Sequence, residues 1–326
     1  MMAPHIDPVA LSIGPYEPFT IFIGVAILAF VFTFSLYRKK LLNLNILKDI
    51  DILSVALVLG VLAFVCWKLT KTQFDIHWYG LMYVFGFSAV WLLVRKQLRE
   101  CGAWEVSVKP EAYEGLFTAL ILGVVLGGRL AYVLFYNFGY YISHPIEILY
   151  VWQGGMSFHG GLVGPIVAGW WYCKKHDMPF MLLMDKFSIV APIGLAFGRM
   201  GNFINGELWG RVVTTPADVP WAMIFPGAGP DPRHPSQLYE LTLEGIVLFL
   251  LLWFTRKCDW PVGMRGALFL AGYAIARIIC ENFRQPDVQL GFIYGDWLTM
   301  GILLSSTMFA AGLSWAIWLL YKGKHK

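Results

Sequence analysis

Long apolar stretches recur along this chain and are separated by short polar connections. About 20 apolar residues in an α-helix are needed to cross the roughly 30 Å of hydrocarbon in a bilayer. Stretches of this length predict about nine membrane spans, over residues 19–37, 51–69, 77–94, 112–136, 156–173, 185–204, 237–255, 265–283 and 296–321. The hydrophobic pattern therefore predicts an all-α polytopic membrane protein.

Basic residues are concentrated in every second connection, and basic connections stay on the cytoplasmic side of a membrane. The sequence therefore predicts an N-terminus outside and a C-terminus in the cytoplasm. The basic clusters contain Arg38, Lys39, Lys40 and Lys48, then Arg95, Lys96, Arg99 and Lys109, then Lys174 and Lys175, then Arg256, Lys257 and Arg265, and finally Lys322, Lys324 and Lys326. The outer loops expected from this topology are 137–155, 205–236 and 284–295.

Composition agrees with the membrane class, since 58% of the residues are apolar and 14% are charged, which is outside the range of soluble proteins. The basic residues form no shared patch, so nucleic-acid binding is not indicated. The 5 cysteines are scattered without a CxxC spacing. Neither a disulfide framework nor a metal site is predicted.

The segment GRMGNFINGELWGR follows the sixth apolar stretch and brings Arg199, Asn202 and Glu207 to the outer membrane boundary. An ionisable group at this depth is costly, so it usually faces a cavity, has a partner and serves a function. Residues three or four apart share a helix face, which groups Arg199 with Asn202 and Arg277 with Glu281. These side chains are the first candidates for a functional site.

Other polar residues near the same boundary have structural interpretations beside the functional ones. Arg129 could be an ion-pair partner of Glu207 or Glu281. His77 could belong to the interfacial aromatic belt, and His159 could be a structural histidine beside glycines. Further residues with such alternatives are Arg211 and Arg284, which could meet lipid headgroup phosphates, and His234 and Gln237, which could cap a helix.

Arg199, Arg277 and His159, all expected near the outer membrane level, suit a phospholipid substrate. A guanidinium binds a phosphodiester bidentately and stays charged at any working pH, and histidine moves a proton near neutral pH. The chemistry that fits is displacement at a carbon whose leaving group is a phosphate, with arginines neutralising the charge that develops. The residues alone name neither the nucleophile nor the lipid.

Six segments, taken in order, make the sequence resemble the prolipoprotein diacylglyceryl transferase family over nearly all of residues 74–321. They are HWYGLMY at 77–83, LGGRLAYVLFYN at 126–137, GGMSFHGGL at 154–162, GRMGNFINGELWGR at 198–211, RHPSQLYE at 233–240 and ARIICENFRQPD at 276–287. The fourth segment is similar to the family signature. Coincidence does not explain so many segments in the family order.

The resemblance implies an enzyme that moves the diacylglyceryl group of phosphatidylglycerol onto the cysteine thiol of a prolipoprotein lipobox, forming a thioether and releasing glycerol 1-phosphate. This is the first step of lipoprotein maturation. The implied partners are phosphatidylglycerol, membrane lipids and a prolipoprotein signal peptide. The family acts at the outer face of the bacterial cytoplasmic (inner) membrane, uses no metal or organic cofactor, and has a seven-span core. That core matches the third to ninth predicted spans.

The resemblance also implies roles for individual residues. Arg199 and Arg277 are expected to hold the lipid phosphate. His159, helped by Tyr79, is expected to take the thiol proton, because a thiolate is the competent nucleophile. Activation of the thiol by the positive field alone is the alternative. The other positions expected to bind substrate are Asn202, Glu207, Gly210, Glu281, Arg129 and His77.

The chain departs from the family near its N-terminus. IDPVALSIGP at 6–15 resembles the short segment that normally leads almost directly into the first core span, yet residues 16–73 separate it from FDIHWYG at 74–80. The extra residues predict two spans joined by RKKLLNLNILKD, so we expect the two flanks of the insertion to meet at the outer surface. The expected organisation is an outer segment over 1–15, an inserted helical hairpin over 16–73 and a transferase core over 74–326.

Two other classes of protein compete with this interpretation. A membrane transporter of an anionic substrate or lipid would also line a cavity with Arg, His and Glu, but it would be expected to show internal symmetry, which the sequence lacks. An intramembrane protease needs a nucleophile and a base in workable geometry. Ser157 and His159 are two residues apart, which places them on different helix faces. Lipid transfer to a lipobox peptide discriminates between the classes.

Overall fold

The structure is a computed structural model of the chain, and it describes residues 2–3, 7–13, 74–151, 154–215, 217–286, 291–295 and 297–324. The chain divides into two compact units. The larger unit contains Met1–Pro4 and Met82–Lys326, and the smaller unit contains His5–Leu81.

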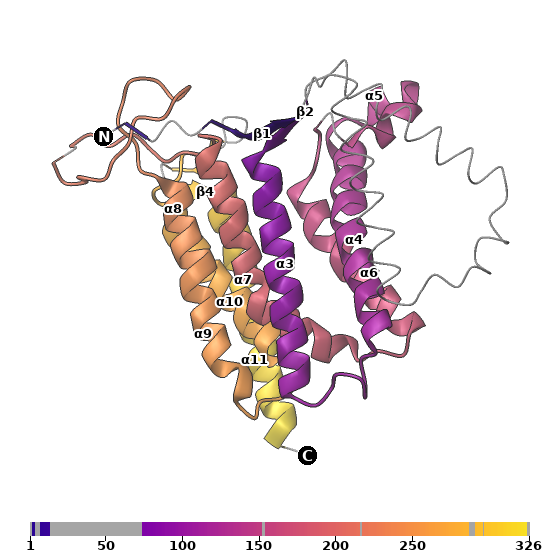
Figure 1. The fold of residues 1–326 in the computed structure, drawn as a ribbon. Helices are drawn as coiled ribbons and strands as arrows, with labels where there is room; N and C mark the ends of the chain where they lie inside the picture. Colours follow the sequence, from indigo (N-terminus) through magenta and orange to yellow (C-terminus); the bar gives the residue numbers. More distant parts are fainter. Residues whose placement is uncertain are drawn as a thin grey trace, which may run out of the picture. The chain divides into compact units, whose positions relative to one another are not determined.

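Helices make up most of the larger unit and follow the order of the apolar stretches (Figure 1). The long helices are α3 (Trp78–Glu100, whose first turn belongs to the smaller unit), α4 (Pro110–Tyr136), α6 (Phe158–Lys175), α7 (Phe180–Ile204), α10 (Met264–Glu281) and α11 (Met300–Lys324). A composite helix joins α8 (Ser236–Glu240), the π-helix η4 (Leu241–Val247), α9 (Leu248–Phe254) and the 3-10 turn η5 (Thr255–Lys257). The short segments α5 (Phe138–Ser143) and η2 (Pro145–Leu149) lie between α4 and α6.

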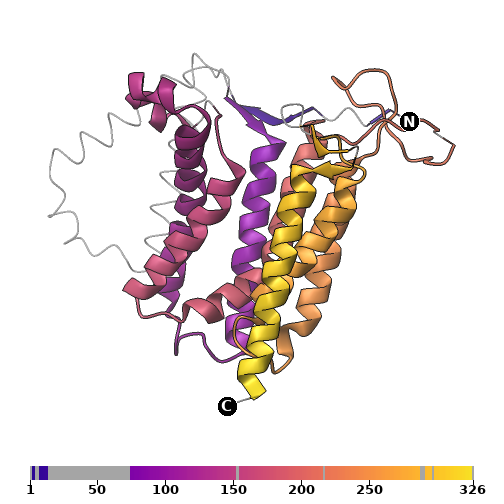
Figure 2. The same cartoon turned by 180° about the vertical axis from the view of Figure 1, so that it is seen from behind.

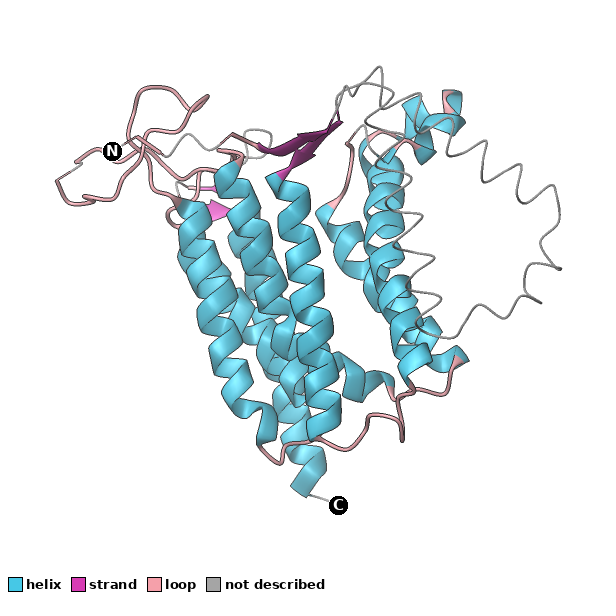
Figure 3. Ribbon diagram, in the orientation of Figure 1, coloured by secondary structure: helices cyan, strands magenta, loops and turns pink. Residues whose placement is uncertain are grey.

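Each predicted span from residue 77 onward coincides with a helix (Figure 3). Five helical segments are long and apolar enough to cross a membrane, namely Trp78–Glu100, Pro110–Tyr136, Phe180–Ile204, Ser236–Lys257 and Met300–Gly323. The predicted fold is therefore confirmed in its coarse form, as a predominantly helical chain with five candidate membrane spans. The predicted spans 19–37 and 51–69 lie outside the described residues.

Short strands require a correction to the all-α prediction. In the larger unit, β3 (Phe292–Tyr294) pairs antiparallel with β4 (Leu298–Thr299) just before α11. An isolated bridge also ties Gly210 to Arg284. Such pairings satisfy backbone N–H and C=O groups that would be costly to leave unpaired near a membrane. These loops are thus folded against one another, which hydropathy does not reveal.

The smaller unit contains an antiparallel pair of strands on either side of the insertion. β1 (Val9–Ile13) pairs with β2 (Phe74–His77), and Ile13 lies opposite Phe74. This register shows that the two segments flanking residues 16–73 lie side by side, whereas their position at the outer surface stays a prediction. The helical hairpin predicted over 16–73 lies outside the described residues.

α4 and α6 approach so closely that glycines form their interface. A Cβ added to Gly127 would clash with the Gly160 carbonyl and would lie 2.7 Å from the Cα of Gly164. Small residues permit such backbone contact between helices in a membrane, where van der Waals packing drives association. This contact holds the first half of α6 against α4, and with it the backbone of His159.

α3, α6, α9 and α11 all terminate at one end of the larger unit, which is the lower end in Figures 1 and 2. We refer to it as the basic end, because basic side chains lie there beside aromatic rings. Arg256 forms an ion pair with Glu100 at 3.2 Å, and its guanidinium lies 4.3 Å from the centroid of the Trp253 ring. Buried apolar side chains at this end include Leu98, Val108, Cys173, Met178 and Leu252. The predicted cytoplasmic connections from residue 95 onward, which the structure describes, therefore share one end of the bundle.

Asp185 joins α7 to the start of α10 at this basic end. Its carboxylate accepts hydrogen bonds from the backbone N–H groups of Gly263 at 2.8 Å and Gly266 at 3.0 Å. The first turn of a helix leaves such donors without intrahelical partners, and a carboxylate there also complements the helix dipole. Both helices run from this level toward the opposite end. At about 1.5 Å per residue, Arg199 of α7 and Arg277 of α10 lie roughly 20 Å further along.

Replacing Asp185 with Ala is expected to destabilise the fold by about 1–3 kcal/mol, because two buried N–H donors lose their acceptor. The measurement is the apparent melting temperature of the purified protein in detergent. Asp259→Ala, which removes an exposed carboxylate at the same end, is the matched control. Equal melting temperatures for the two variants would show that the Asp185 hydrogen bonds do not contribute to stability.

Candidate functional site

Six charged side chains meet at the end of the bundle opposite the basic connections. They come from α7, from α8 and η4, from α10 and from the segment that follows α10. We refer to this group as the charged cluster, which consists of Arg199, Glu240, Glu244, Arg277, Glu281 and Arg284. Segments far apart in the sequence therefore contribute to one site.

Glu240 is the centre of the charged cluster and pairs with all three of its arginines. Its Oε2 lies 2.7 Å from Arg199 Nε, and its Oε1 lies 2.9 Å from Arg277 Nη1 and 3.1 Å from Arg284 Nη1. A buried carboxylate remains ionised at tolerable cost only when it is paired and hydrogen-bonded. One carboxylate thus bridges Arg199 and Arg277, the two arginines expected to hold a phosphate.

Glu244 contacts Arg199 and Arg277 at longer range. Its Oε2 lies 3.5 Å from Arg199 Nη2 and its Oε1 lies 3.4 Å from Arg277 Nη1, and its side chain is 0% exposed. It belongs to η4, and π-helical turns are rare and often mark functional sites. Gly245 allows η4 to approach α7, because a Cβ there would lie 2.6 Å from the Cβ of Ala196. This close packing keeps Glu244 beside Arg199.

Glu281 holds the other side of Arg277, as the helical spacing predicts. Its Oε2 lies 2.8 Å from Arg277 Nη2, and its Oε1 accepts a hydrogen bond from Thr299 Oγ1 in β4 at 2.9 Å. The predicted pairing of Arg277 with Glu281 is confirmed. Nη1 contacts Glu240 and Glu244, so both terminal nitrogens of Arg277 contact carboxylates.

The charged cluster contains three guanidinium groups and three carboxylates, so the formal charges cancel when all six are ionised. The exposure of these groups is uneven. The side chains of Arg199 and Arg277 are 18% and 14% exposed, whereas those of Glu240, Glu244 and Glu281 are at most 6% exposed. A molecule that approaches the charged cluster therefore meets guanidinium groups before it meets carboxylates.

Glu207 braces the turn that follows α7. Its Oε1 accepts a hydrogen bond from Asn202 Nδ2 at 2.8 Å, and its carbonyl accepts one from Gln237 Nε2 at 2.6 Å. The idea that Gln237 caps the helix that starts at Ser236 is wrong, because no side chain caps α8. Asn202 and Glu207, both expected to bind substrate, are bonded to each other and connect the end of α7 to the start of α8.

Gly210 lies where three stretches of backbone cross. Its N–H donates to the His234 carbonyl at 2.9 Å, and it forms a bridge with Arg284. A Cβ at this position would lie 2.5 Å from the carbonyl oxygens of both His234 and Phe283. Only glycine leaves room for both, so the position is explained by close backbone approach.

The two interfacial arginines contact protein atoms. Arg284 is buried and pairs with Glu240, so its interpretation as a ligand of lipid headgroups is wrong. Arg211 donates from Nε to the Arg284 carbonyl at 3.0 Å and from Nη2 to the Glu281 carbonyl at 3.3 Å. Arg211 therefore ties its own loop to the end of α10, at the backbone carbonyl of Glu281.

Arg129 binds backbone carbonyls between α5 and α6, not the carboxylate that the ion-pair interpretation suggests. Its buried guanidinium donates to the carbonyls of Glu147 at 2.6 Å, Ile148 at 2.9 Å and Gly154 at 2.6 Å. The expected ion pair with Glu207 or Glu281 is therefore wrong, because backbone carbonyls take these donors. Arg129 holds the chain between η2 and α6 in place.

The remaining predicted site residues are placed only in part. His159 lies in the first turn of α6, and its side chain is outside the described part of the structure. Tyr79 lies in the first turn of α3 and His77 ends β2, and both belong to the smaller unit. The roles expected of these three residues stay predictions.

Glu240 and Glu244 are not among the site residues predicted from the sequence. A signal for them is present in the sequence, since two carboxylates four residues apart share a helix face and enter an otherwise apolar stretch. Ionisable groups in such a position are functional candidates by default. Their contact with Arg199 and Arg277 depends on tertiary packing and could not be read from spacing.

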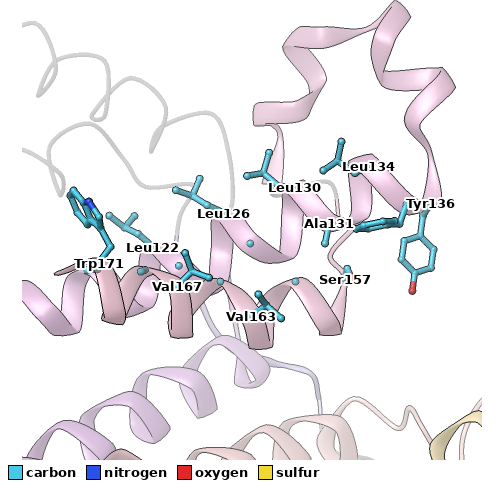
Figure 4. Close-up of a pocket in the computed structure, with 17 residues that line it drawn as sticks. Leu122, Leu126, Leu130, Ala131, Leu134, Tyr136, Ser157, Val163, Val167 and Trp171 are labelled. Carbon is cyan, nitrogen blue, oxygen red and sulfur yellow. The ribbon is translucent and has the colours of Figure 1, made fainter. Parts of the chain in front are cut away.

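Two hollows lie in the larger unit. A groove of about 910 Å³ runs along α4 and α6, and Figure 4 shows its apolar lining, which includes Leu126 and Leu130 of α4 and Val163 and Val167 of α6. A smaller cavity of about 340 Å³ is lined by Val219, Trp221, His234, Tyr239, Thr242, Leu243, Cys280 and Phe283. Within the described residues, no group of three or more His, Cys, Asp or Glu side chains is placed to hold a metal ion.

Three side chains that line the smaller cavity are linked through the hydroxyl of Tyr239. Trp221 Nε1 donates to the Tyr239 hydroxyl at 2.6 Å, and His234 Nδ1 lies 3.1 Å from the same oxygen. Burial lowers the pKa of His234 below its usual value, because a buried site disfavours the charged imidazolium. Burial therefore favours the neutral form of His234.

Comparisons with known proteins match most of the chain. The family model described as prolipoprotein diacylglyceryl transferase matches residues 64–318. A relative from Aliivibrio salmonicida is 52% identical over 74% of this chain and 83% of its own length. Relatives from Legionella pneumophila subsp. pneumophila and Pseudomonas paraeruginosa are 49% and 50% identical over 74% of this chain, and over 92% and 89% of their own lengths. Each of these relatives is named phosphatidylglycerol--prolipoprotein diacylglyceryl transferase.

Replacing Gly210 with Ala is expected to lower stability by about 1–3 kcal/mol, because the methyl group overpacks a site bounded by backbone that cannot turn away. The measurement is the apparent melting temperature in detergent. Gly139→Ala is the control, because a Cβ there has nothing within 4 Å. If Gly210→Ala melts together with Gly139→Ala, the crossing is not constrained as the contacts indicate.

Proposed function

The chain belongs to the prolipoprotein diacylglyceryl transferase family, and we propose that it transfers the diacylglyceryl group of phosphatidylglycerol to a prolipoprotein, the activity in the names of its relatives. The acceptor in this proposal is the thiol of the lipobox cysteine in the signal peptide. The products are a thioether-linked lipid and glycerol 1-phosphate. This transfer is the first step of lipoprotein maturation.

The observation that carries the proposal at the level of the site is the bridging of Arg199 and Arg277 by one carboxylate. Arg199 contacts one oxygen of Glu240 at 2.7 Å and Arg277 contacts the other at 2.9 Å. The two non-bridging oxygens of a phosphodiester are spaced much like those of a carboxylate, and arginine binds either group with parallel N–H donors. Two arginines that can share a carboxylate can therefore share the lipid phosphate.

The reaction needs these arginines most when its leaving group departs. The thiolate attacks the glyceryl carbon next to the phosphate, a C–S bond forms and the C–O bond breaks. The electron pair of that bond leaves with the phosphate oxygen, which gains negative charge. Donors already in position stabilise such charge without further rearrangement. Arg199 and Arg277, the more exposed groups of the charged cluster, carry this role in the proposal.

The thiol proton must leave before or during the attack, and we assign its removal to His159, assisted by Tyr79. Histidine is suited to this transfer near neutral pH. Arg129 acts indirectly, because it holds the carbonyls of Glu147 and Gly154 and so positions the chain that enters α6. Its proposed role is therefore positioning of the His159 segment, in place of substrate binding.

The membrane arrangement proposed for the chain extends the five candidate spans. We assign α6 and α10 as crossing segments too, which gives a seven-span core. The basic connections face the cytoplasm, and the charged cluster then faces the outer side of the bacterial inner membrane. The N-terminus lies outside and the C-terminus inside, and the hairpin proposed for 16–73 adds two crossings without reversing the core. In this arrangement loops 137–155, 205–236 and 284–295 lie on the outer side.

The activity is tested by incubating purified protein with phosphatidylglycerol and a fluorescent lipobox peptide. We expect a shift in the electrophoretic mobility of the peptide, because the attached lipid changes its size and polarity. A peptide with serine in place of the lipobox cysteine is the control and should not shift. Absence of transfer under conditions in which the lipid binds would favour a transporter of an anionic lipid instead.

Replacing Arg199 or Arg277 with Lys is expected to lower the turnover of the lipobox peptide by about 100-fold or more, the scale seen when a preorganised donor is lost. Lysine keeps the charge but cannot bind two oxygens with parallel donors. Arg256→Lys, in an ion pair at the basic end, is the matched control and should retain activity. Full activity of either test variant would contradict bidentate phosphate binding.

Replacing His159 with Gln is expected to reduce turnover by about 100-fold, because general base catalysis contributes on that scale. The loss should shrink as the pH rises and the peptide thiol ionises without help. The measurement is the pH profile of turnover for the variant and for the unmodified protein. Unchanged turnover would remove His159 from the mechanism and leave the positive field to activate the thiol.

A further inference from the structure

The charged cluster has no net formal charge before a lipid binds, because three carboxylates balance three guanidinium groups. A phosphodiester adds one negative charge. In a buried site an unbalanced charge is expensive, since protein and lipid replace water around it. The charged cluster must therefore either move a carboxylate into water or neutralise one when the phosphate arrives.

Movement into water is not open to the carboxylate that the arginines hold least closely, which is Glu244. Glu244 is 0% exposed, and Gly245 keeps η4 pressed against Ala196 of α7. Its side chain lies behind the guanidinium groups of Arg199 and Arg277. Neutralisation by a proton is the remaining way to balance the charge.

The distances decide which carboxylate accepts that proton. Glu240 contacts three arginines at 2.7, 2.9 and 3.1 Å. Glu281 contacts Arg277 at 2.8 Å and is also bonded to Thr299. Glu244 contacts its arginines only at 3.5 and 3.4 Å. Coulomb attraction and hydrogen bonding both weaken with distance, so Glu244 loses least when it becomes neutral.

Three of the elements packed against Glu244, namely α7, α8 and α10, place charged or titratable groups near it. Arg199 faces it from α7, Glu240 from α8, and Arg277 from α10. Tyr273 and Cys280 of α10 also lie within its electrostatic reach. Residues 248–254, which form α9, contain no titratable side chain. Among these groups, Glu240 is the one carboxylate that could compete for the proton, and its closer arginines disfavour that.

We propose that Glu244 takes up one proton as the lipid phosphate binds, so that the charge it contributes beside Arg199 and Arg277 in the empty site is replaced by the charge of the phosphate. This inference rests on the proposed function, because it requires the phosphate to bind at these two arginines. Glu244 acts through the arginines and does not touch the reacting atoms, so it is a positioning residue.

The test is calorimetric titration of short-chain phosphatidylglycerol into the purified full-length protein. The titration is repeated at one pH in two buffers that differ in ionisation enthalpy. The difference in observed heat gives the number of protons taken up, and we expect about one per lipid bound. No peptide is present and a phosphodiester does not titrate near neutral pH, so the uptake reports on the protein. Binding without proton uptake would overturn the inference.

Glu244→Gln keeps the shape and an oxygen acceptor but carries no charge. In this variant we expect no proton uptake, and we expect the Kd for phosphatidylglycerol to be independent of pH and lower than normal above neutral pH. For the unmodified protein, the Kd should rise up to about tenfold per pH unit where uptake occurs. A structural role alone would weaken binding in the variant and leave the pH dependence in place.

Three further variants locate the proton. Glu100→Gln removes an ion-paired carboxylate at the basic end and should retain the uptake, as should His159→Gln. Loss of the uptake in Glu240→Gln or His159→Gln, together with its retention in Glu244→Gln, would overturn the assignment. A protein that fails the peptide-transfer assay contradicts the proposed function, whereas one that transfers lipid but binds it without a proton contradicts only this inference.

Discussion

The cost of placing ionised groups at the end of apolar helices is the constraint on which the rest of this structure depends. Six such groups lie together in the charged cluster, and each would be strongly unfavourable alone. Pairing lowers that cost but seldom makes a buried ion pair a net source of stability. Hydrophobic side chains of similar size would hold these helices together at least as well, so the arrangement is better explained by chemistry than by folding.

The surrounding fold is arranged so that these charges meet without adjustment. Asp185 sets the level of α7 against α10 at the basic end, and the two helices then deliver Arg199 and Arg277 to the same depth. η4 and the close contact at Gly245 bring Glu244 to that depth from a third element. The folded loops at Gly210 complete the arrangement. Long-range placement by rigid helices therefore determines the geometry of the site.

Much of the fold could be predicted from hydropathy, because apolar length and helix length are both set by the thickness of the membrane. The pairing of Arg277 with Glu281 followed from helical spacing alone. The partners of Arg129 and Arg284 could not be predicted, because they depend on how loops pack, and a loop carries no periodic signal. Glu240 and Glu244 show the same limit. Their spacing predicts that they share a helix face, but it does not predict which side chains of other helices lie opposite them. Resemblance supplied the substrate, which no pattern of polarity names.

The carboxylates also explain how a site with two arginines can release its product. Two unpaired guanidinium groups in a dry site would bind any phosphate tightly, including the glycerol phosphate left after transfer. Tight binding of substrate and product alike adds nothing to the rate of the chemical step. The negative charge on the leaving oxygen grows as the C–O bond breaks and is largest in the released phosphate, so bare guanidinium groups would hold the product most tightly. Carboxylates that compete for the same donors weaken both bound states. In the proposed mechanism, Glu240 and Glu244 thus limit how tightly Arg199 and Arg277 hold the phosphate before and after the transfer.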